Sequence, residues 1–285
     1  MPLVTIALPI YNGAVYMRRT IESVLNQDFT DFELIIHDNA SADETPAIAA
    51  EYVARDPRVR YVRLPETVDV CRNFLGALSL ARGEFFSWIA HDDFYDDPGH
   101  LGRLVEALRQ GRSLAFPNVN LAHYGDDGRI ERITRDHFGA FRGVTGRLNV
   151  LKVVARFPSQ QFYGLYRIEV LRRYVYMWEQ CVGLRCFNEG RFVHKFLADE
   201  PCAFVPDAAL NVGVHELNTG RTTSAGRLLR DYARYSFGLL ADYHRNATLT
   251  MAEKLVIYSQ IARIHVPYGM RMLGSVLKRG LMPGR

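Results

Sequence analysis

The chain has 285 residues, 48% of them hydrophobic, which suffices for a sizeable buried core and excludes a disordered or fibrous protein. The net charge is +4 with arginines spread along the chain, so a nucleic-acid-binding protein is disfavoured, whereas anionic small molecules and anionic lipid surfaces are suitable partners. The cysteines form no CxxC pair, which argues against a disulfide scaffold or a zinc cluster; they are Cys71, Cys181, Cys186 and Cys202.

Strand-like and helix-like segments alternate through the first 120 residues, the pattern of a mostly parallel sheet covered by helices. The sequence predicts strands over 4–8, 32–37, 59–63 and 85–89 and helices over 14–27, 43–54 and 69–81. Pro46 is tolerated only near the first turn of its helix. Gly83 is expected to end the third helix in a left-handed conformation.

The pattern weakens after residue 120. Residues 123–146 are rich in Gly, Asp and Arg, and we expect a mobile loop there. Strands are expected over 161–166, 203–205 and 209–214, and helices over 168–178 and 187–198. From residue 225 onward the pattern is helical, and Pro267 is expected to break or kink the last long segment.

No positively charged leader precedes the first strand, and no run of 18 apolar residues occurs. We therefore expect a cytoplasmic protein, with the inner face of the cell membrane as an alternative location. The segment 252–278 mixes apolar and basic residues, so it either lies on an anionic membrane or docks on its own core.

Polar residues follow three of the predicted strands, at the carboxyl ends where open parallel sheets bind their ligands. Asp92 and Asp93 offer the oxygen ligands that Mg²⁺ and Mn²⁺ share with substrate phosphates. Asp38 is suited to accept a hydrogen bond from a nucleotide base, and Tyr11 to flank its ring. The chain has no glycine-rich phosphate loop, so a metal and arginines must meet the phosphate charge.

Three motifs, in this order, resemble the opening of family 2 glycosyltransferases: VTIALPIYN at 4–12, IESVLNQ at 21–27 and DNASAD at 38–43. ARGEF at 81–85 ahead of HDD at 91–93 continues the resemblance over about the first 100 residues. It implies a GT-A fold, a Rossmann-like, mostly parallel sheet flanked by helices with a C-terminal helical extension. It also implies that the enzyme inverts the anomeric configuration and uses a nucleotide sugar together with Mn²⁺ or Mg²⁺. The expected donor is a UDP-sugar, with GDP- and dTDP-sugars as alternatives.

The resemblance also implies which residues form the site. The family's acidic motif is usually Asp-x-Asp, and Ala90 stands at its first position, which leaves the metal ligand set open. Asp92 stands at the position of the second aspartate of this motif. The candidate metal ligands are Asp92, Asp93 and His215, and the candidate nucleotide-sugar ligands are Pro9, Tyr11, Asn12, Asp38, Asn39, Arg72, His91, Asp92 and Arg221.

Inverting transfer needs a carboxylate that takes the proton of the acceptor hydroxyl. Family 2 enzymes carry it at the start of a helix on the acceptor side, and Glu189 stands at the matching place, where aspartate is commoner. Further on, NVGVH at 211–215 resembles the family's segment ending in a histidine, which makes His215 a ligand of the metal or the diphosphate. In the polar loop that follows, Arg221 is suited to pair with phosphate oxygens.

Structural roles compete with these assignments. Asp92 and Asp93 can begin a turn, and Asp38 can form an Asx turn. Glu189 can be a first-turn glutamate that interacts favourably with the helix dipole. His215 can be a structural histidine whose hydrogen bonds are all made within the protein. Arg72 is by default an exposed helix arginine.

We expect a GT-A domain over 1–224, with a nucleotide-sugar-binding half (1–120) and an acceptor-side half (121–224), and a helical region over 225–285. The expected acceptor is a saccharide or a lipid-linked saccharide. A catalytically silent nucleotide-sugar-binding protein is one rival, suggested by Ala90 and Glu189. A sugar-phosphate nucleotidyltransferase is the other, but it should carry a glycine-rich loop with Arg and Lys after the first strand.

Overall fold

A computed structural model describes residues 1–125, 127–135, 160–179, 188–215, 224–247 and 249–280. Its contacts divide the chain into two compact units. The first contains Met1–Arg142, Gln161–Val182 and Glu200–His215, and the second contains Gly143–Gln160, Gly183–Asp199 and Glu216–Arg285. The expected domain boundary at residue 224 stays a prediction.

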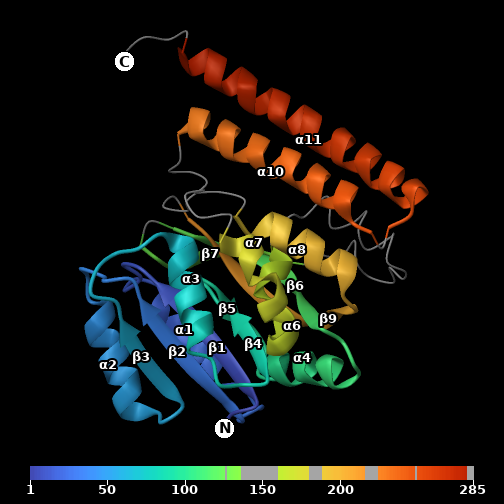
Figure 1. The fold of residues 1–285 in the computed structure, drawn as a ribbon. Coiled ribbons are helices and arrows are strands. Elements are labelled where there is room, and N and C mark those ends of the chain that lie inside the picture. The colour runs from blue at the N-terminus through green and yellow to red at the C-terminus, as the bar shows by residue number, and fades with distance from the viewer. Residues whose placement is uncertain (126, 136–159, 180–187, 216–223, 248, 281–285) are drawn as a thin grey trace. The chain divides into compact units, whose positions relative to one another are not determined.

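The strands of the first unit form one sheet (Figure 1), in the order β3-β2-β1-β4-β8-β6-β9-β5 with β7 beside β6. β3, β2, β1 and β4 are parallel, as are β6 and β9, whereas β8, β7 and β5 run antiparallel to their neighbours. β1 lies between β2 and β4, so the strand order reverses at β1, which is where open sheets bind their ligands. The described strands are β1 (Val4–Ile10), β2 (Phe32–Asp38), β3 (Val59–Arg63), β4 (Phe85–Trp88), β5 (Phe94–Tyr95), β6 (Leu114–Tyr124), β7 (Ile130–Thr134), β8 (Leu165–Arg167) and β9 (Cys202–Val214).

The helices of the first unit follow from their apolar spacing and their caps. α1 buries Met17, Ile21 and Val24, which recur every three to four residues. Pro46 lies in the first turn of α2 as expected, and Asp69 caps α3 by accepting a hydrogen bond from the backbone N–H of Cys71. The helical segments are α1 (Met17–Leu25), α2 (Thr45–Arg55), α3 (Val70–Ser79), α4 (His100–Arg109), the 3₁₀ turns η2 (Gln160–Tyr163) and η3 (Arg172–Tyr174), and the short helices α6 (Ile168–Leu171) and α7 (Val175–Glu179).

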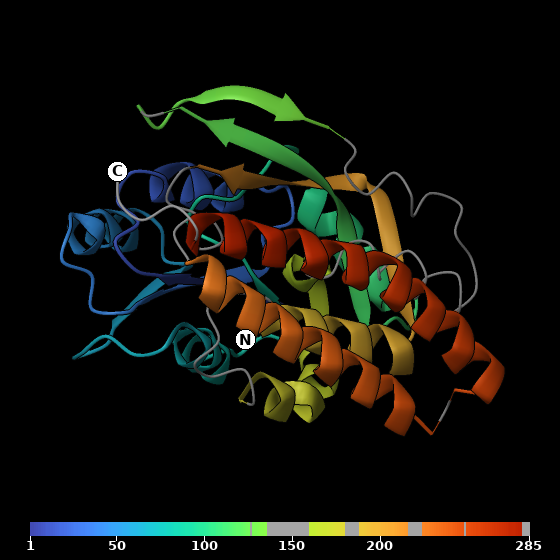
Figure 2. The same cartoon turned by 90° about the horizontal axis from the view of Figure 1, so that it is seen from above.

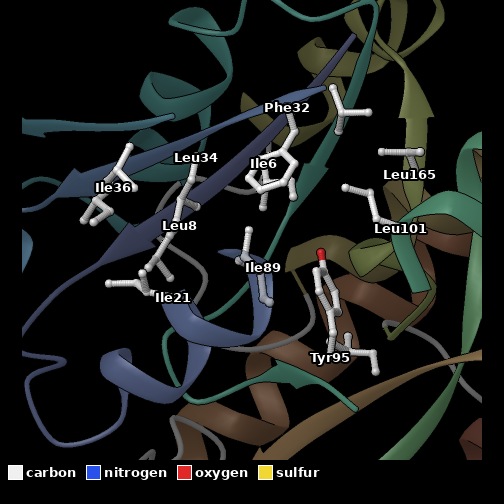
Figure 3. Close-up of a cluster of buried hydrophobic side chains, with 14 of the residues drawn as sticks. Ile6, Leu8, Ile21, Phe32, Leu34, Ile36, Ile89, Tyr95, Leu101 and Leu165 are labelled. Carbon is white, nitrogen blue, oxygen red and sulfur yellow. The ribbon is translucent and has the colours of Figure 1, made fainter. Parts of the chain in front are cut away.

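The core lies against the central strands (Figure 3). Every residue of β1 and β2 is buried, which is typical of parallel strands covered on both faces. Leu8, Ile36 and Ile21 belong to the cluster that joins β1, β2 and α1, and Leu101 adds α4 to it. This core fixes where the carboxyl ends of the strands stand.

Gly83 corrects one expectation. Its backbone is not left-handed. A Cβ atom at Gly83 would lie 2.6 Å from the backbone nitrogen of Thr5, and the Thr5 hydroxyl accepts the Gly83 N–H at 2.9 Å. The glycine is therefore required by the close approach of two chain segments, and not by a helix cap.

The structure also differs from the sequence-based expectations after residue 120. Part of the stretch expected as a loop is β7, which pairs with β6 (the two green strands of Figure 2); residues 136–159 lie outside the described residues. The strand expected over 161–166 begins only at Leu165, after η2. Gly164, between them, passes so near Ala115 that a Cβ would lie 2.7 Å from its carbonyl oxygen. The two strands expected over 203–205 and 209–214 are one strand, β9, whose register against β6 shifts between Pro117 and Asn118.

The described helices of the second unit are α8 (Asn188–Asp199), α10 (Ala225–Arg245) and α11 (Met251–Gly280). α10 and α11 lie side by side (Figures 1 and 2). Arg191 of α8 donates two hydrogen bonds to Asp242 of α10, at 2.8 and 2.9 Å. Pro267 lies inside α11, so of the two expected effects the break is wrong and the kink stays a prediction; a proline removes one backbone hydrogen bond, and the turns on both sides keep the helix continuous. Within the described ranges, no helix has the length and apolar character to cross a membrane.

Candidate functional site

The loops that follow β1 and β2 are bound to each other. The backbone N–H of Asn12 donates to the Ser41 hydroxyl at 2.9 Å, and the Asn12 side-chain oxygen accepts from the backbone N–H of Ala42 at 2.9 Å. The N–H of Gly13 donates to the Thr45 hydroxyl at 3.0 Å. Two predicted ligand segments, 9–13 and 38–43, are therefore held as one piece at the carboxyl edge of the sheet.

Both loops contain a non-glycine residue in the left-handed region. Asn12 has φ of 49° and Ala40 has φ of 59°, and the described residues contain no other non-glycine residue with positive φ. Alanine in this conformation costs about 1 kcal/mol, so the hydrogen bonds around it must hold it there. Backbone strain of this kind gathers at ligand sites.

Asp38 ends β2 with its side chain fully buried. Oδ2 accepts a hydrogen bond from the Tyr61 hydroxyl at 2.6 Å and lies 3.5 Å from Nε of Arg63, while Oδ1 accepts from the backbone N–H of Ser41 at 2.9 Å. Burial and the Asp38 charge raise the pKa of Tyr61, which keeps its hydroxyl a donor. The N–H that Oδ1 accepts is three residues on, whereas an Asx turn uses the N–H two residues on, so this bond fixes the loop without forming that turn. The base-binding role of Asp38 stays a prediction.

The other predicted nucleoside ligands differ in what they offer. Tyr11 is 49% exposed, so its ring is accessible to a base, whereas Pro9 is buried within β1. The Asn39 side chain donates to the carbonyl of Val68 at 2.9 Å and accepts from its N–H at 2.8 Å, so its amide fixes the loop after β3. Arg72 is an exposed residue of α3.

The acidic segment after β4 meets the end of β9. Nε2 of His215 lies 2.9 Å from Oδ2 of Asp92, and both residues are buried. Nδ1 of His91 lies 3.9 Å from Oδ1 of Asp92. Burial acts to raise the pKa of Asp92, but the hydrogen bond from His215 and the positive potential of both histidines outweigh burial, so the pKa lies below its ordinary value. Asp92 is therefore kept as a carboxylate.

Gly213 makes this meeting possible. A Cβ atom at Gly213 would lie 2.6 Å from the backbone oxygen of Asp92 and 2.9 Å from its Oδ2, closer than real Cβ atoms come to other groups. The N–H of Gly213 also donates to Oδ1 of Asp93 at 2.9 Å. The glycine of the NVGVH motif thus lets β9 contact both aspartates.

Asp93 is turned toward β9. Its residue is 2% exposed, and Oδ2 has no hydrogen-bond partner among the described residues. Burial raises the pKa of Asp93 well above its ordinary value, and the charge of Asp92 raises it further. The two neighbouring aspartates therefore differ: Asp92 is ionised and paired with His215, while Asp93 is biased toward its neutral form.

One face of α1 holds the acidic segment in place. The Thr20 hydroxyl lies 2.8 Å from the carbonyl oxygen of His91 and 2.6 Å from that of Asp93. Ser23 accepts a hydrogen bond from the N–H of Tyr95 at 3.1 Å, and Gln27 accepts from the N–H of Leu101 and donates to the carbonyl of Asp97. Positions 20 and 23 share one face of α1, and Gln27 lies two residues after the helix ends. This gives a structural role to the motif at 21–27, which the sequence left without one.

Aromatic rings surround the Asp92–His215 pair. The Tyr16 ring stacks on His215 with a centroid distance of 4.8 Å and an interplanar angle of 23°, and it packs against Tyr124 at 4.7 Å. The Tyr124 hydroxyl donates to the backbone oxygen of Asp92 at 3.0 Å. Neither tyrosine was found from the sequence; Tyr16 precedes a helix and Tyr124 ends a long strand, and nothing local links them to Asp92.

Asp92 and His215 can serve as two ligands of one divalent ion. Two neighbouring ligands of an octahedral ion with bonds of about 2.1 Å lie about 3 Å apart, which fits the 2.9 Å between Oδ2 and Nε2. In the parts of the chain that are described, no group of three or more His, Cys, Asp and Glu side chains is arranged to hold a metal. Among the described residues, Asp92 and His215 are therefore a pair with suitable spacing, and their role as metal ligands stays a prediction.

Two predicted residues remain, Glu189 and Arg221. Glu189 lies in the first turn of α8, in the second unit. Burial raises the pKa of Tyr235, and the charge of Glu189 makes a smaller contribution in the same direction. Arg221 lies outside the described residues. The roles of both residues stay predictions.

Comparison with known proteins identifies relatives of this architecture. Residues 5–174 match the family model described as glycosyl transferase family 2. The chain is 39% identical over 95 residues to an uncharacterized glycosyltransferase of Rickettsia prowazekii, covering 33% of this chain and 28% of the relative. It is 36% identical over 116 residues to the chondroitin synthase of Escherichia coli, covering 40% and 16%. The chain thus spans less than a third of the length of these curated relatives.

Solved structures share the fold. TarS of S. aureus (residues 1–349, with UDP-GlcNAc) superimposes with a TM-score of 0.67 at 17% identity over 94% of this chain and 73% of the other. The mannosyltransferase of Pyrobaculum calidifontis, in complex with GDP-Man and Mn²⁺, gives 0.61 at 15% identity over 100% and 76%. These likenesses confirm the expected GT-A fold.

Proposed function

The chain belongs to glycosyl transferase family 2, and we propose that it transfers a sugar from a nucleotide-sugar donor to an acceptor hydroxyl, inverting the anomeric configuration. The observation that carries this proposal is the Asp92–His215 pair at the carboxyl end of β4, beside the joined loops after β1 and β2. A buried, ionised carboxylate in contact with an imidazole, at the point where the strand order reverses, is a suitable place for a cation-bridged diphosphate.

We propose a UDP-sugar as donor. The exposed ring of Tyr11 and the carboxylate of Asp38 are the groups that would contact the nucleoside, and Asn12 and Asn39 would act by fixing the loops that carry them. The structural neighbour in complex with UDP-GlcNAc supports a uridine nucleotide, and the one in complex with GDP-Man keeps a guanosine nucleotide as the alternative. His91, Arg72 and Arg221 are the proposed partners of the diphosphate charge.

The proposed cofactor is Mn²⁺ or Mg²⁺, held by Asp92 and His215. Mg²⁺ prefers oxygen ligands, so the imidazole favours Mn²⁺. When bound, the ion supplies the positive charge that stabilises the departing diphosphate. Asp93 is a further candidate ligand through Oδ2, although its neutral bias also fits a structural role.

Glu189 is the proposed base. In inverting transfer the carboxylate accepts the proton of the acceptor hydroxyl as that oxygen attacks the anomeric carbon. The acceptor we propose is a saccharide or a lipid-linked saccharide, as in polysaccharide biosynthesis; the relationship to a chondroitin synthase supports a saccharide. The nucleotidyltransferase alternative is weaker, because the loop after β1, Tyr11-Asn12-Gly13, holds no Arg or Lys.

The test is Mn²⁺-dependent release of nucleoside diphosphate from a panel of UDP-, GDP- and dTDP-sugars. We expect turnover of one nucleotide class, a loss of about 100-fold or more in Asp92→Ala, and no change in Glu66→Gln, an exposed carboxylate on the loop after β3. Glu189→Gln should keep donor binding and lose transfer to an acceptor. Binding without turnover would favour the silent protein, and pyrophosphorolysis would favour the nucleotidyltransferase.

A further inference from the structure

Charge is distributed unequally along the chain. Residues 225–285 contain ten Lys and Arg against three Asp and Glu, a net charge of +7, whereas residues 1–224 contain 25 against 28, a net charge of −3. The segment of α10 and α11 is therefore a basic part of a chain that is otherwise slightly acidic. Such an asymmetry points to an anionic partner for these helices.

α11 carries an exposed apolar face. Leu255, Val266, Met270 and Leu273 are 59%, 60%, 63% and 38% exposed. At 100° per residue these four positions lie within an arc of about 60° on the helix. Ile257 and Ile261, by contrast, are 1% and 2% exposed, so the buried side of α11 is made of other residues. α11 thus buries one side of the helix and leaves an apolar face exposed on another side.

Positive charge accompanies this apolar face. Arg263 is exposed one turn before Val266, and the last ten residues of the helix add Arg271, Lys278 and Arg279 to its sequence. Glu253 is the only acidic residue of α11. The exposed apolar side chains of such a helix can insert at the boundary of the acyl chains, and its surplus of positive charge can bind the anionic headgroups.

We propose that α11 binds the surface of membranes that contain anionic phospholipid, lying in the interface with Leu255, Val266, Met270 and Leu273 toward the acyl chains. A nucleic acid would use the charge but not the apolar face. A second copy of this chain would use the apolar face, but its own +7 segment would repel it. Binding of this kind needs no catalytic activity, so it stands apart from the proposed transferase reaction, and it would place the protein where lipid-linked acceptors are found.

The experiment is flotation of the purified full chain with vesicles of phosphatidylcholine alone and of phosphatidylcholine mixed with phosphatidylglycerol. We expect binding to the mixed vesicles only, and at least about tenfold weaker binding when salt is raised from about 0.05 to 0.5 M, because screening removes the attraction of the headgroups. The double variant Val266→Asp, Met270→Asp should lose binding at least about tenfold. The matched control is Val53→Asp, which changes an exposed valine of α2 in the first unit and should bind as the wild type does.

Thermal unfolding of each variant, followed by circular dichroism, distinguishes a loss of the binding surface from unfolding of the protein. If the double variant is unfolded, Arg263→Gln takes its place and should weaken binding measurably. Equal binding to both kinds of vesicle, no binding at low salt, or unchanged binding of a folded double variant would overturn the proposal. A concentration-dependent dimer that the double variant abolishes, without vesicle binding by the wild type, would assign the face to a second copy instead. Diphosphate release in vesicle-free buffer reports on the transferase proposal independently.

Discussion

The imidazole Nε2 of His215 lies 2.9 Å from the carboxylate Oδ2 of Asp92, although 123 positions of sequence separate the two residues. β4 delivers the aspartate and β9 delivers the histidine, and α1 holds the segment between β4 and β5 through Thr20. The proposed metal pair is therefore made by three elements of the first unit. Its consequences are open to measurement.

Replacing His215 should lower the affinity for the metal more than it lowers the stability of the fold. His215→Phe keeps a ring against Tyr16 but removes the nitrogen that contacts Asp92. We expect diphosphate release to fall about 10- to 100-fold and the Mn²⁺ concentration for half-maximal rate to rise. His244→Phe, at an exposed position of α10, is the control. An unchanged Mn²⁺ dependence in His215→Phe would make this histidine structural.

Gly213 should tolerate no side chain. In Gly213→Ala the new methyl group would meet the backbone oxygen, Cβ and Oδ2 of Asp92, and we expect a loss of about 1–3 kcal/mol in the free energy of unfolding together with reduced activity. Gly226→Ala on α10 meets no atom within 4 Å and should leave stability unchanged or raise it by up to about 1 kcal/mol. Urea unfolding of both variants decides; equal stability would show that β9 can move away from Asp92 without cost.

The Tyr16 ring should matter more than its hydroxyl. Tyr16 is stacked on His215, so Tyr16→Phe keeps the contact that orients the imidazole while Tyr16→Leu removes it. We expect Tyr16→Phe to behave as the wild type and Tyr16→Leu to bind Mn²⁺ about tenfold more weakly. The measurement is the Mn²⁺ dependence of diphosphate release at saturating donor. If both variants lose activity equally, the hydroxyl and not the stacked ring is required.

His100 should make the fold sensitive to acid. Burial lowers its pKa to about 3 from 6.5, so below about pH 6.5 the unfolded chain takes up a proton that the folded chain refuses. Stability is therefore lost as pH falls, by about 2 kcal/mol from this group between about pH 7.5 and 5. Asp93, whose pKa is raised, acts in the opposite sense.

The comparison is with His100→Phe, which keeps a ring against Tyr95, where the imidazole now stacks at a centroid distance of 4.0 Å. Because Asp93 is common to both proteins, the difference between them isolates His100. We expect the variant to lose less unfolding free energy than the wild type between the two pH values. Parallel losses would mean that His100 is protonated in the folded protein.

The sequence by itself determined the local elements of the first half and the positions where ligands can meet them. The apolar spacing of Met17, Ile21 and Val24 gives α1, and the buried run Phe32–Asp38 gives β2, because helix and strand periodicity are local properties. Asp38 and Asp92 were found for the same reason: each follows a strand, and the carboxyl ends of parallel strands share one edge. The family resemblance carried the same inference to His215.

Only the tertiary structure decided which of these residues touch. That Asp92 pairs with His215 while Asp93 faces Gly213 depends on β9 running parallel to β6 and ending beside the acidic segment. The need for glycine at positions 83, 164 and 213 and the stacking of Tyr16 on His215 arise in the same way. These are contacts between residues tens to more than a hundred positions apart. Local periodicity holds no information on them, because packing and hydrogen bonding select them only once the sheet has formed.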